Sequence, residues 1–264
     1  MSKKFKFSTG PIGPGALPLD FTGVAYDLNI YATETTQRFV LGTRAEFWDG
    51  RKYVYSKSAA ACISGQGCEH TKIGYTAITN FAVAVSVGNT SVTVPAATHA
   101  ALTEDYLAGG YICIFDGSTN NTQFRGIVGN DAAAANALFV VYLDAPLTEA
   151  VVAATSKCET YESPYIGLQT GTSASLPKAG VPAAKVSAAN VYFWCQIEGY
   201  TWVAPQGTVI NNEGVGVMWR HDGSLEALAT AIGGTVPDAD TTQYAGHLAA
   251  GSYTLIGPLL NLRG

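Results

Sequence analysis

The sequence predicts a mainly β fold, built as two small β-barrel or β-sandwich units with an extended N-terminal arm and few short helices. Alternating apolar residues recur in short runs, and only residues 225–232 resemble a helix. The runs are separated by turn dipeptides at Asp49-Gly50, Gly88-Asn89, Asp116-Gly117 and Asp222-Gly223. Short strands at near-regular spacing, with turn residues between them, are typical of small barrels and sandwiches.

We expect three parts along the chain. Residues 1–22 carry three prolines among glycines without any periodicity, which favours an extended arm, although a frayed terminus fits equally well. Residues 23–160 are expected to form a β-rich domain with hairpins. The chain then becomes polar and rich in small residues over 169–178, which is typical of a linker or long loop, so residues 161–264 are expected to form a second small barrel-like domain.

In the first domain, we expect a hairpin over residues 39–55 with a tight two-residue turn at Asp49-Gly50, because such a turn needs a positive φ that glycine adopts freely and aspartate tolerates. Residues 81–94 alternate strictly and predict a second hairpin, with its turn at Gly88-Asn89. Further strands are expected at 111–115, 123–128 and 138–143.

In the second domain, the expected strands are residues 184–187, 191–197, 200–203, 215–219 and 253–262. Glu198-Gly199 and Asp222-Gly223 are the expected turns between them. The helix-like stretch, residues 225–232, is brief.

The surface chemistry is unusual for a protein of 264 residues. Charged residues make up 13% of the chain, against about 25% for an average soluble domain, and the mean hydropathy is +0.14. Either the fold is very compact or other subunits cover much of its outside, and we favour the second explanation because obligate interfaces are more apolar than ordinary surface. A homo-oligomer is therefore expected.

Nucleic acid and membranes are not expected partners. The formal charge is −5, and the basic residues are scattered apart from Lys3, Lys4 and Lys6, whereas phosphate recognition needs clustered cations. No apolar run approaches the roughly 20 residues that span a bilayer, and no apolar segment follows the basic cluster as a signal peptide would require.

No catalytic, cofactor or metal site is expected. The four histidines lie in no motif that carries a known mechanism, and no phosphate-binding glycine motif occurs. The dipeptide His221-Asp222 is better explained by a turn. Cys62, Cys68 and His70 lack a suitably spaced fourth ligand for zinc, and the odd number of cysteines favours free buried thiols.

Aromatic side chains cluster in one region of the second domain. Tyr192 and Trp194 are expected to share one strand face, as are Tyr200 and Trp202. Such residues can form a core, anchor a protein interface or stack against sugars. The core is the simplest explanation, and the interface and the glycan platform stay open as alternatives.

Several segments resemble virion structural proteins of tailed bacteriophages, of the type that decorates or stabilises the head. The segments that carry the resemblance are Leu41-Gly42-Thr43, residues 49–55, 85–94, Gly110-Tyr111, Asp116-Gly117 and residues 123–127, 163–165, 191–199 and 207–209. In this chain Asn190 precedes the aromatic strand, where the family is expected to have glycine.

The resemblance implies a non-enzymatic protein on the outside of the capsid, made in the host cytoplasm and present in several symmetric copies. Its partner would be the major capsid protein. The hypothesised contact residues are Phe5 and Phe7 in the arm, with Tyr192, Trp194, Tyr200 and Trp202 in the second domain. A carbohydrate-binding or host-adhesion module, or another head-tail structural component, is the alternative, using the face that carries Tyr200 and Trp202.

Overall fold

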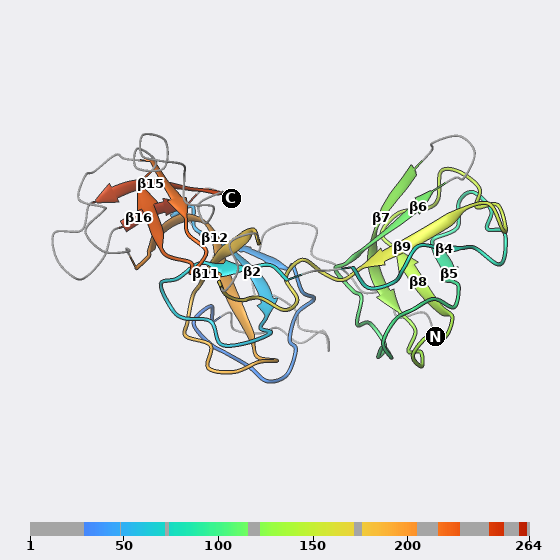
Figure 1. The fold of residues 1–264 in the computed structure, drawn as a ribbon, viewed down its shortest axis with the longest axis horizontal. Coiled ribbons are helices and arrows are strands. Elements are labelled where there is room, and N and C mark those ends of the chain that lie inside the picture. The colour runs from blue at the N-terminus through green and yellow to red at the C-terminus, as the bar shows by residue number, and fades with distance from the viewer. Residues whose placement is uncertain are drawn as a thin grey trace. The chain divides into compact units, whose positions relative to one another are not determined.

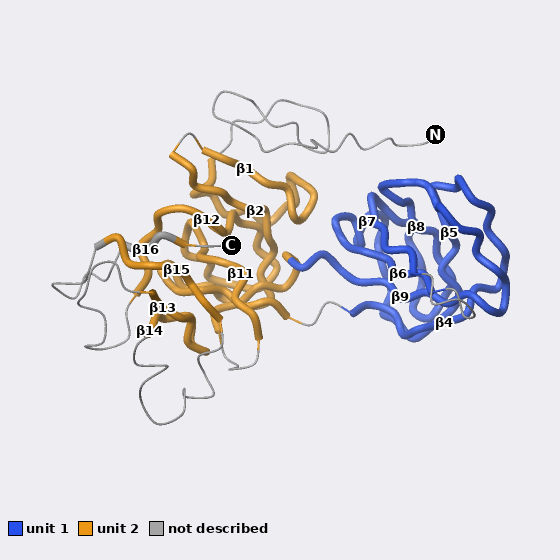
Figure 2. The backbone as a smooth tube through the Cα atoms, turned by 90° about the horizontal axis from the view of Figure 1, so that it is seen from above, with its two compact units in different colours: residues 1–5, 72–164 blue, residues 6–71, 165–264 orange. Residues whose placement is uncertain are grey.

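The computed structural model describes residues 29–47, 49–71, 74–115, 122–171, 176–204, 216–227, 243–250 and 259–262. Within these ranges the regular secondary structure consists of strands, with no helix, which confirms the expected mainly β fold (Figure 1). The described residues fall into two compact units (Figure 2). The arm over residues 1–22, with Phe5 and Phe7, lies outside the described residues.

Unit 1 comprises the described residues between 74 and 164 and contains one antiparallel sheet of six strands. Its order is β4-β9-β6-β7-β8-β5. The strands are β4 (Thr79–Asn80), β5 (Ser91–Val94), β6 (Tyr111–Phe115), β7 (Thr122–Asn130), β8 (Phe139–Leu143) and β9 (Lys157–Tyr161). The strands expected at 111–115, 123–128 and 138–143 are thereby confirmed.

One side of this sheet forms an aliphatic core. On β6, Ile112 and Ile114 are buried. Tyr111, Cys113 and Phe115, which alternate with them, are partly exposed. This is the two-residue period of a strand with one covered face. The inward residues of unit 1 pack in a single cluster that includes Phe81, Val92, Val94, Leu107, Ile127, Phe139, Val141 and Leu147.

The hairpin expected over residues 81–94 is wrong. Strand β5 pairs with β8, while Val85 forms an antiparallel bridge with Val151. Phe81 is buried, but Val83 and Val87 are exposed, so the apolar alternation before Gly88 does not mark a buried strand face. Alternation indicates which side chains share a face, and it leaves the choice of pairing partner to the tertiary fold.

Unit 2 comprises residues 29–71 and 165–262 where these are described, and its longest strand is β12 (Tyr192–Trp202). The strands follow the path β10-β3-β11-β12-β16-β15-β13-β14, and β2 pairs with both β12 and β1. Their bounds are β1 (Arg44–Glu46), β2 (Lys52–Lys57), β3 (Cys68–Glu69), β10 (Gln169–Thr170), β11 (Lys178–Pro182), β13 (Gly216–Trp219), β14 (Leu225–Ala227), β15 (Gln243–Ala250) and β16 (Leu259–Leu262).

The turn expected at Glu198-Gly199 is also wrong, because β12 continues through it. The strand pairs with β2 up to Glu198 and with β16 from Gly199 onward. A register shift lies between Gln196 and Glu198, and Gly199 has a φ of 90°. A bulge with a left-handed glycine bends a strand without ending it, so one strand serves two parts of the sheet.

Two predicted hairpin turns are confirmed in position and have the same geometry, but the connection at Asp49-Gly50 is one residue longer than the predicted two-residue turn. Asp49-Gly50 connects β1 to β2, and Asp222-Gly223 connects β13 to β14. In each turn the glycine has a φ of 83° and the aspartate Oδ1 accepts a hydrogen bond from the amide two residues later. A three-residue connection with glycine in the left-handed region is a common hairpin type.

The residues following the second turn correct another expectation. Residues 225–227 of the helix expected over 225–232 form strand β14, because the hairpin returns them to β13. The rest of that stretch lies outside the described residues.

The structure divides the chain differently from the expected domains 23–160 and 161–264. Residues 29–71 belong with the C-terminal part, because β2 pairs with β12 and β3 pairs with β10 and β11. Unit 1 is therefore an insertion. Glu69 pairs with Gln169 just outside it, and Gly74 bridges Tyr161 just inside it, so the chain enters and leaves unit 1 through neighbouring segments.

Candidate binding face

The aromatic residues of β12 are divided between a core and a surface. Trp194 is buried, and its ring contacts those of Phe39 and Tyr55 at centroid distances of 5.5 and 5.2 Å. Tyr192 is half-buried and stacks on Tyr55 at 5.9 Å. The pKa of Tyr55 is raised, and burial is the largest cause. Trp194 therefore belongs to a packed aromatic cluster, where a partner protein would not reach it.

Tyr200 and Trp202, beyond the bulge, lie on the surface. Their side chains are 52% and 43% exposed. They share a strand face because they are two residues apart. The ring of Trp202 lies against Gly65, where an added Cβ would overlap it, and the Ala204 amide donates to the Gly65 carbonyl. Gly65 has a φ of 78°, so the glycine allows both the backbone turn and the close approach of the ring.

Two further residues join this surface from β15. Tyr200 pairs with Asn261, which pairs with His247, so the register places Tyr200 and His247 on one face. The register shift between Val217 and Met218 turns Tyr244 to the same side, and the Tyr244 hydroxyl lies 2.9 Å from His247 Nδ1. We call Tyr200, Trp202, Tyr244 and His247 the aromatic face of unit 2.

Sequence reasoning did not place Tyr244 or His247 on this face. Residues 243–250 lack a clear alternation, and the bulge places residues three apart on the same side. The opposite side of these strands packs in a core cluster of Val181, Val203, Val217, Trp219, Leu225, Ala245, Leu248 and Leu262. The sheet therefore has one buried face and one face with half-exposed aromatic side chains.

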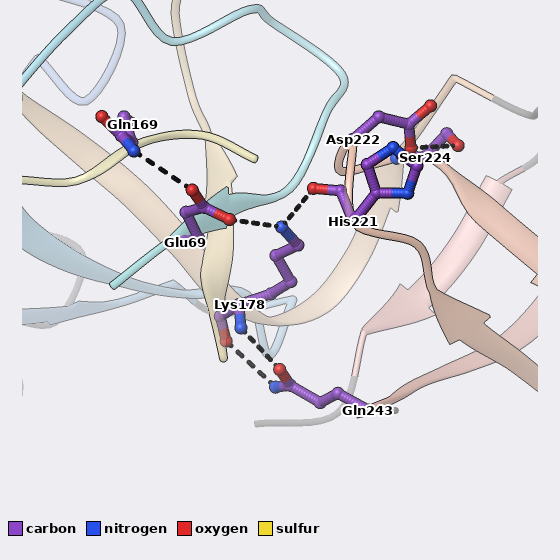
Figure 3. Close-up of polar contacts among 7 residues, drawn as sticks. All are labelled: Glu69, Gln169, Lys178, His221, Asp222, Ser224 and Gln243. Carbon is purple, nitrogen blue, oxygen red and sulfur yellow. Dashed lines mark hydrogen bonds and ion pairs between the residues drawn. The ribbon is translucent and has the colours of Figure 1, made fainter. Parts of the chain in front are cut away.

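A buried polar network lies elsewhere in unit 2 (Figure 3). Lys178 Nζ donates to Glu69 Oε2 at 2.9 Å and to the His221 carbonyl at 2.6 Å. Gln169 Nε2 donates to the other Glu69 oxygen, and Gln243 exchanges hydrogen bonds with the backbone of Lys178. The side chains of Glu69 and Lys178 are 0% and 3% exposed. This network holds segments from both halves of the chain together.

The pair His221-Asp222 has a structural role at the edge of this network. Burial raises the pKa of Asp222, but the hydroxyl and amide of Ser224 both donate to its carboxylate, and the net pKa is lowered. The aspartate closes the turn, and the carbonyl of His221 accepts from Lys178.

The cysteines show no arrangement for metal binding. Cys62, Cys68, Cys158 and Cys195 are buried free thiols, and burial raises the pKa of Cys158 to about 12. In the described part of the chain, no group of three or more His, Cys, Asp or Glu side chains could hold a metal ion. The described residues also contain no helix long and apolar enough to cross a membrane.

Comparison with known proteins finds no match: no family model, no curated protein and no solved structure is similar to this chain.

Proposed function

We propose that the protein is a non-enzymatic structural protein of a tailed-bacteriophage virion, which binds the outside of the capsid and stabilises it. The observation that carries the proposal is the aromatic face of unit 2. Two large aromatic side chains, Tyr200 and Trp202, are half-exposed on a sheet whose other side is a complete core. Buried aromatic anchors dominate the energetics of protein interfaces.

The sparse charge supports the same conclusion. With 13% charged residues, the chain has few groups that would oppose burial of its surface in an assembly. Exposed apolar side chains also occur in unit 1, at Ile78, Val83, Val87, Phe124, Leu138, Tyr142 and Val152. A protein that binds only the assembled shell stabilises that shell by mass action, and repetition on a symmetric lattice adds avidity.

A carbohydrate-binding function is the second candidate, and it has its own supporting observation. Tyr244 and His247 provide a hydrogen-bonded polar pair on the same face as Tyr200 and Trp202. Stacking rings beside polar groups suit a sugar ring, which has apolar faces and hydroxyl edges. This ligand would use the same residues, so a single set of variants tests both functions.

The test is co-sedimentation of the purified protein with undecorated heads of the phage that encodes it. We expect binding by the native protein and at least about a ten-fold loss of affinity in Tyr200→Ser/Trp202→Ser, because two interface anchors are removed. The matched control is Tyr31→Ser, which removes an exposed aromatic ring outside the aromatic face. Native melting temperatures would establish that all variants are folded.

Two results would contradict the proposal. If the native protein does not co-sediment with heads, the proposal that this chain binds the capsid is wrong. If the native protein binds heads and the Tyr200/Trp202 variant binds equally well, the aromatic face is not the docking surface. Saturable binding to a glycan array, lost in the same variant, would support the carbohydrate function instead.

A further inference from the structure

The outward side of the sheet in unit 1 carries a second aromatic surface. The register of β9, β6 and β7 sets Tyr161 beside Tyr111, and it places Cys113 between Glu159 on β9 and Phe124 on β7. The residues that alternate with these are buried, including Ile112, Ile114, Cys158 and Thr160. We call Tyr111, Phe115, Phe124, Glu159 and Tyr161 the outer face of unit 1.

This face combines exposed rings with carboxylates. Phe124 is 56% exposed and stacks on Tyr111, with ring centroids 5.0 Å apart and an interplanar angle of 21°. The Tyr161 hydroxyl donates to Glu159 Oε2 at 2.7 Å. A Cβ added to Gly126 would lie 2.6 Å from Asp144 Oδ2, so a second carboxylate covers the glycine next to Tyr111.

The charge of the chain is unevenly distributed. Residues 72–164 contain three basic and eight acidic residues, a net charge of −5, whereas the rest of the chain contains twelve of each. Residues 72–164, which include the described part of unit 1, therefore account for the whole net negative charge of the chain. The densest basic segment is Lys3, Lys4 and Lys6, which alternate with Phe5 and Phe7.

We propose that the outer face of unit 1 is the docking site of the protein's own segment Lys3–Phe7. In an extended segment, Phe5 and Phe7 point to one side and can pack on Tyr111 and Phe124. The flexible lysine stems reach around the segment toward the carboxylates of Glu159 and Asp144. Lysine ammonium groups are also attracted to aromatic ring faces.

The charges around this face are mixed but favour a basic ligand. Lys157 lies on the outward side of β9 at its first residue, beside Phe115. Arg125 of β7 is held by the Pro146 carbonyl and the Thr148 hydroxyl. Glu159 and Asp144 lie beside the exposed rings, and the acidic excess of residues 72–164 adds long-range attraction.

The connection between the segment and the first described residue is long. Residues 8–28 number twenty-one, which can extend to about 70 Å, more than twice the diameter of a small domain. Because the segment is tethered, its effective concentration is high and a modest intrinsic affinity is sufficient to keep it docked. The proposal does not depend on the proposed virion function.

The test uses a protein that lacks residues 1–9 and a labelled peptide of those nine residues, followed by fluorescence anisotropy. We expect saturable binding that weakens as salt is raised, because the attraction of exposed charges is screened. Full-length protein should bind the peptide at least about ten-fold more weakly, because its own segment occupies the face. A peptide with Phe5→Ser and Phe7→Ser should bind at least about ten-fold more weakly to the truncated protein.

Surface variants locate the site. Phe124→Ser/Glu159→Gln in the truncated protein should weaken peptide binding by at least about ten-fold, and Tyr31→Ser, which removes an exposed ring outside both faces, should leave it unchanged. The proposal is overturned if the peptide does not bind, if the Phe124/Glu159 variant binds it as well as its parent, or if full-length and truncated proteins bind it alike. Loss of capsid binding with Tyr200 and Trp202 tests the other proposal separately.

Discussion

The two units differ in how the chain builds them. The described part of unit 1 comes from one stretch of the chain, and β6, β7 and β8 follow one another both in the sequence and in the sheet. Unit 2 is assembled from two stretches, and its central strand β12 pairs with β2, which precedes it by more than a hundred residues. The sheet of unit 2 can therefore form only when residues from both stretches have come together.

The interiors of the units differ in the same way. The core cluster of unit 1 is a single apolar group, whereas unit 2 has separate core clusters and the buried ion pair between Glu69 and Lys178. In unit 2 the buried ion pair connects β3 to β11, and mispairing of these strands would leave a buried charge without its partner. We therefore expect unit 2 to be the more easily destabilised unit, because its sheet joins segments that are far apart in the sequence.

Lys178→Met should have the largest effect on the stability of unit 2. It leaves Glu69 buried without its cation, which costs about 3–5 kcal/mol in unfolding free energy. Because all four tryptophans lie outside residues 72–164, tryptophan fluorescence during urea unfolding would report on unit 2. Hydrogen exchange of the β6 and β8 amides would show that unit 1 is unchanged.

Two further variants control this prediction. Lys178→Met/Glu69→Leu should recover much of the loss, because no unpaired charge remains. Lys52→Met removes the exposed ion pair with Glu198 and should change stability far less. Equal losses in Lys178→Met and Lys52→Met would contradict a special role for the buried pair.

Gly199→Ala and Gly88→Ala compare the units at matched backbone positions, since their φ values are 90° and 88°. Gly88 has nothing near its Cβ position, so the substitution should cost about 1–2 kcal/mol from backbone strain alone. At Gly199 the Cβ would lie 2.9 Å from Arg51 Cα, which adds about 1–3 kcal/mol. Denaturant midpoints would measure both, and equal costs would contradict the close approach of β12 to the first hairpin.

Excision of unit 1 should have a smaller effect. An added Cβ at Gly167 would lie 2.7 Å from Thr71 Oγ1, so a short Gly-Ser linker can replace residues 72–164. We expect the tryptophan-detected unfolding free energy to stay within about 1 kcal/mol of the native value, because the joined ends are already held together. Failure of the shortened protein to fold would show that unit 2 needs the insertion.

The smallest expected effect is a pH dependence confined to unit 2. The pKa of Asp222 is lowered in the folded protein, so its carboxylate stabilises the fold above its ordinary pKa of about 3.8. That contribution is lost as the pH falls through the lowered value. Tryptophan-detected melting temperatures between pH 7 and 2 should therefore fall more steeply below about pH 3.8 in the native protein than in Asp222→Asn; parallel curves would contradict the prediction.

Local chemistry in the sequence determined much of this protein. Alternation and glycine turns predicted the strands at 111–115 and 138–143 and the hairpin turns at Gly50 and Gly223, because side-chain direction and positive φ are properties of neighbouring residues. Among the aromatic residues, the pattern predicted that Tyr200 and Trp202 share a face. It could not predict that Trp194 is core and Trp202 is surface.

The pairing of the strands and the boundaries of the units depend on long-range contacts. The alternating residues before Gly88 suggested a hairpin, but β8 is the partner of β5, and Gly199 bends β12 where a turn was expected. Residues far apart in the sequence also make the ion pair between Glu69 and Lys178. The same is true of the aromatic face, where β16 lies between the strands that carry Tyr200 and Tyr244, and of the boundaries of unit 1. Strand pairing is a long-range choice between similar apolar partners, and a local pattern carries no information about distance along the chain.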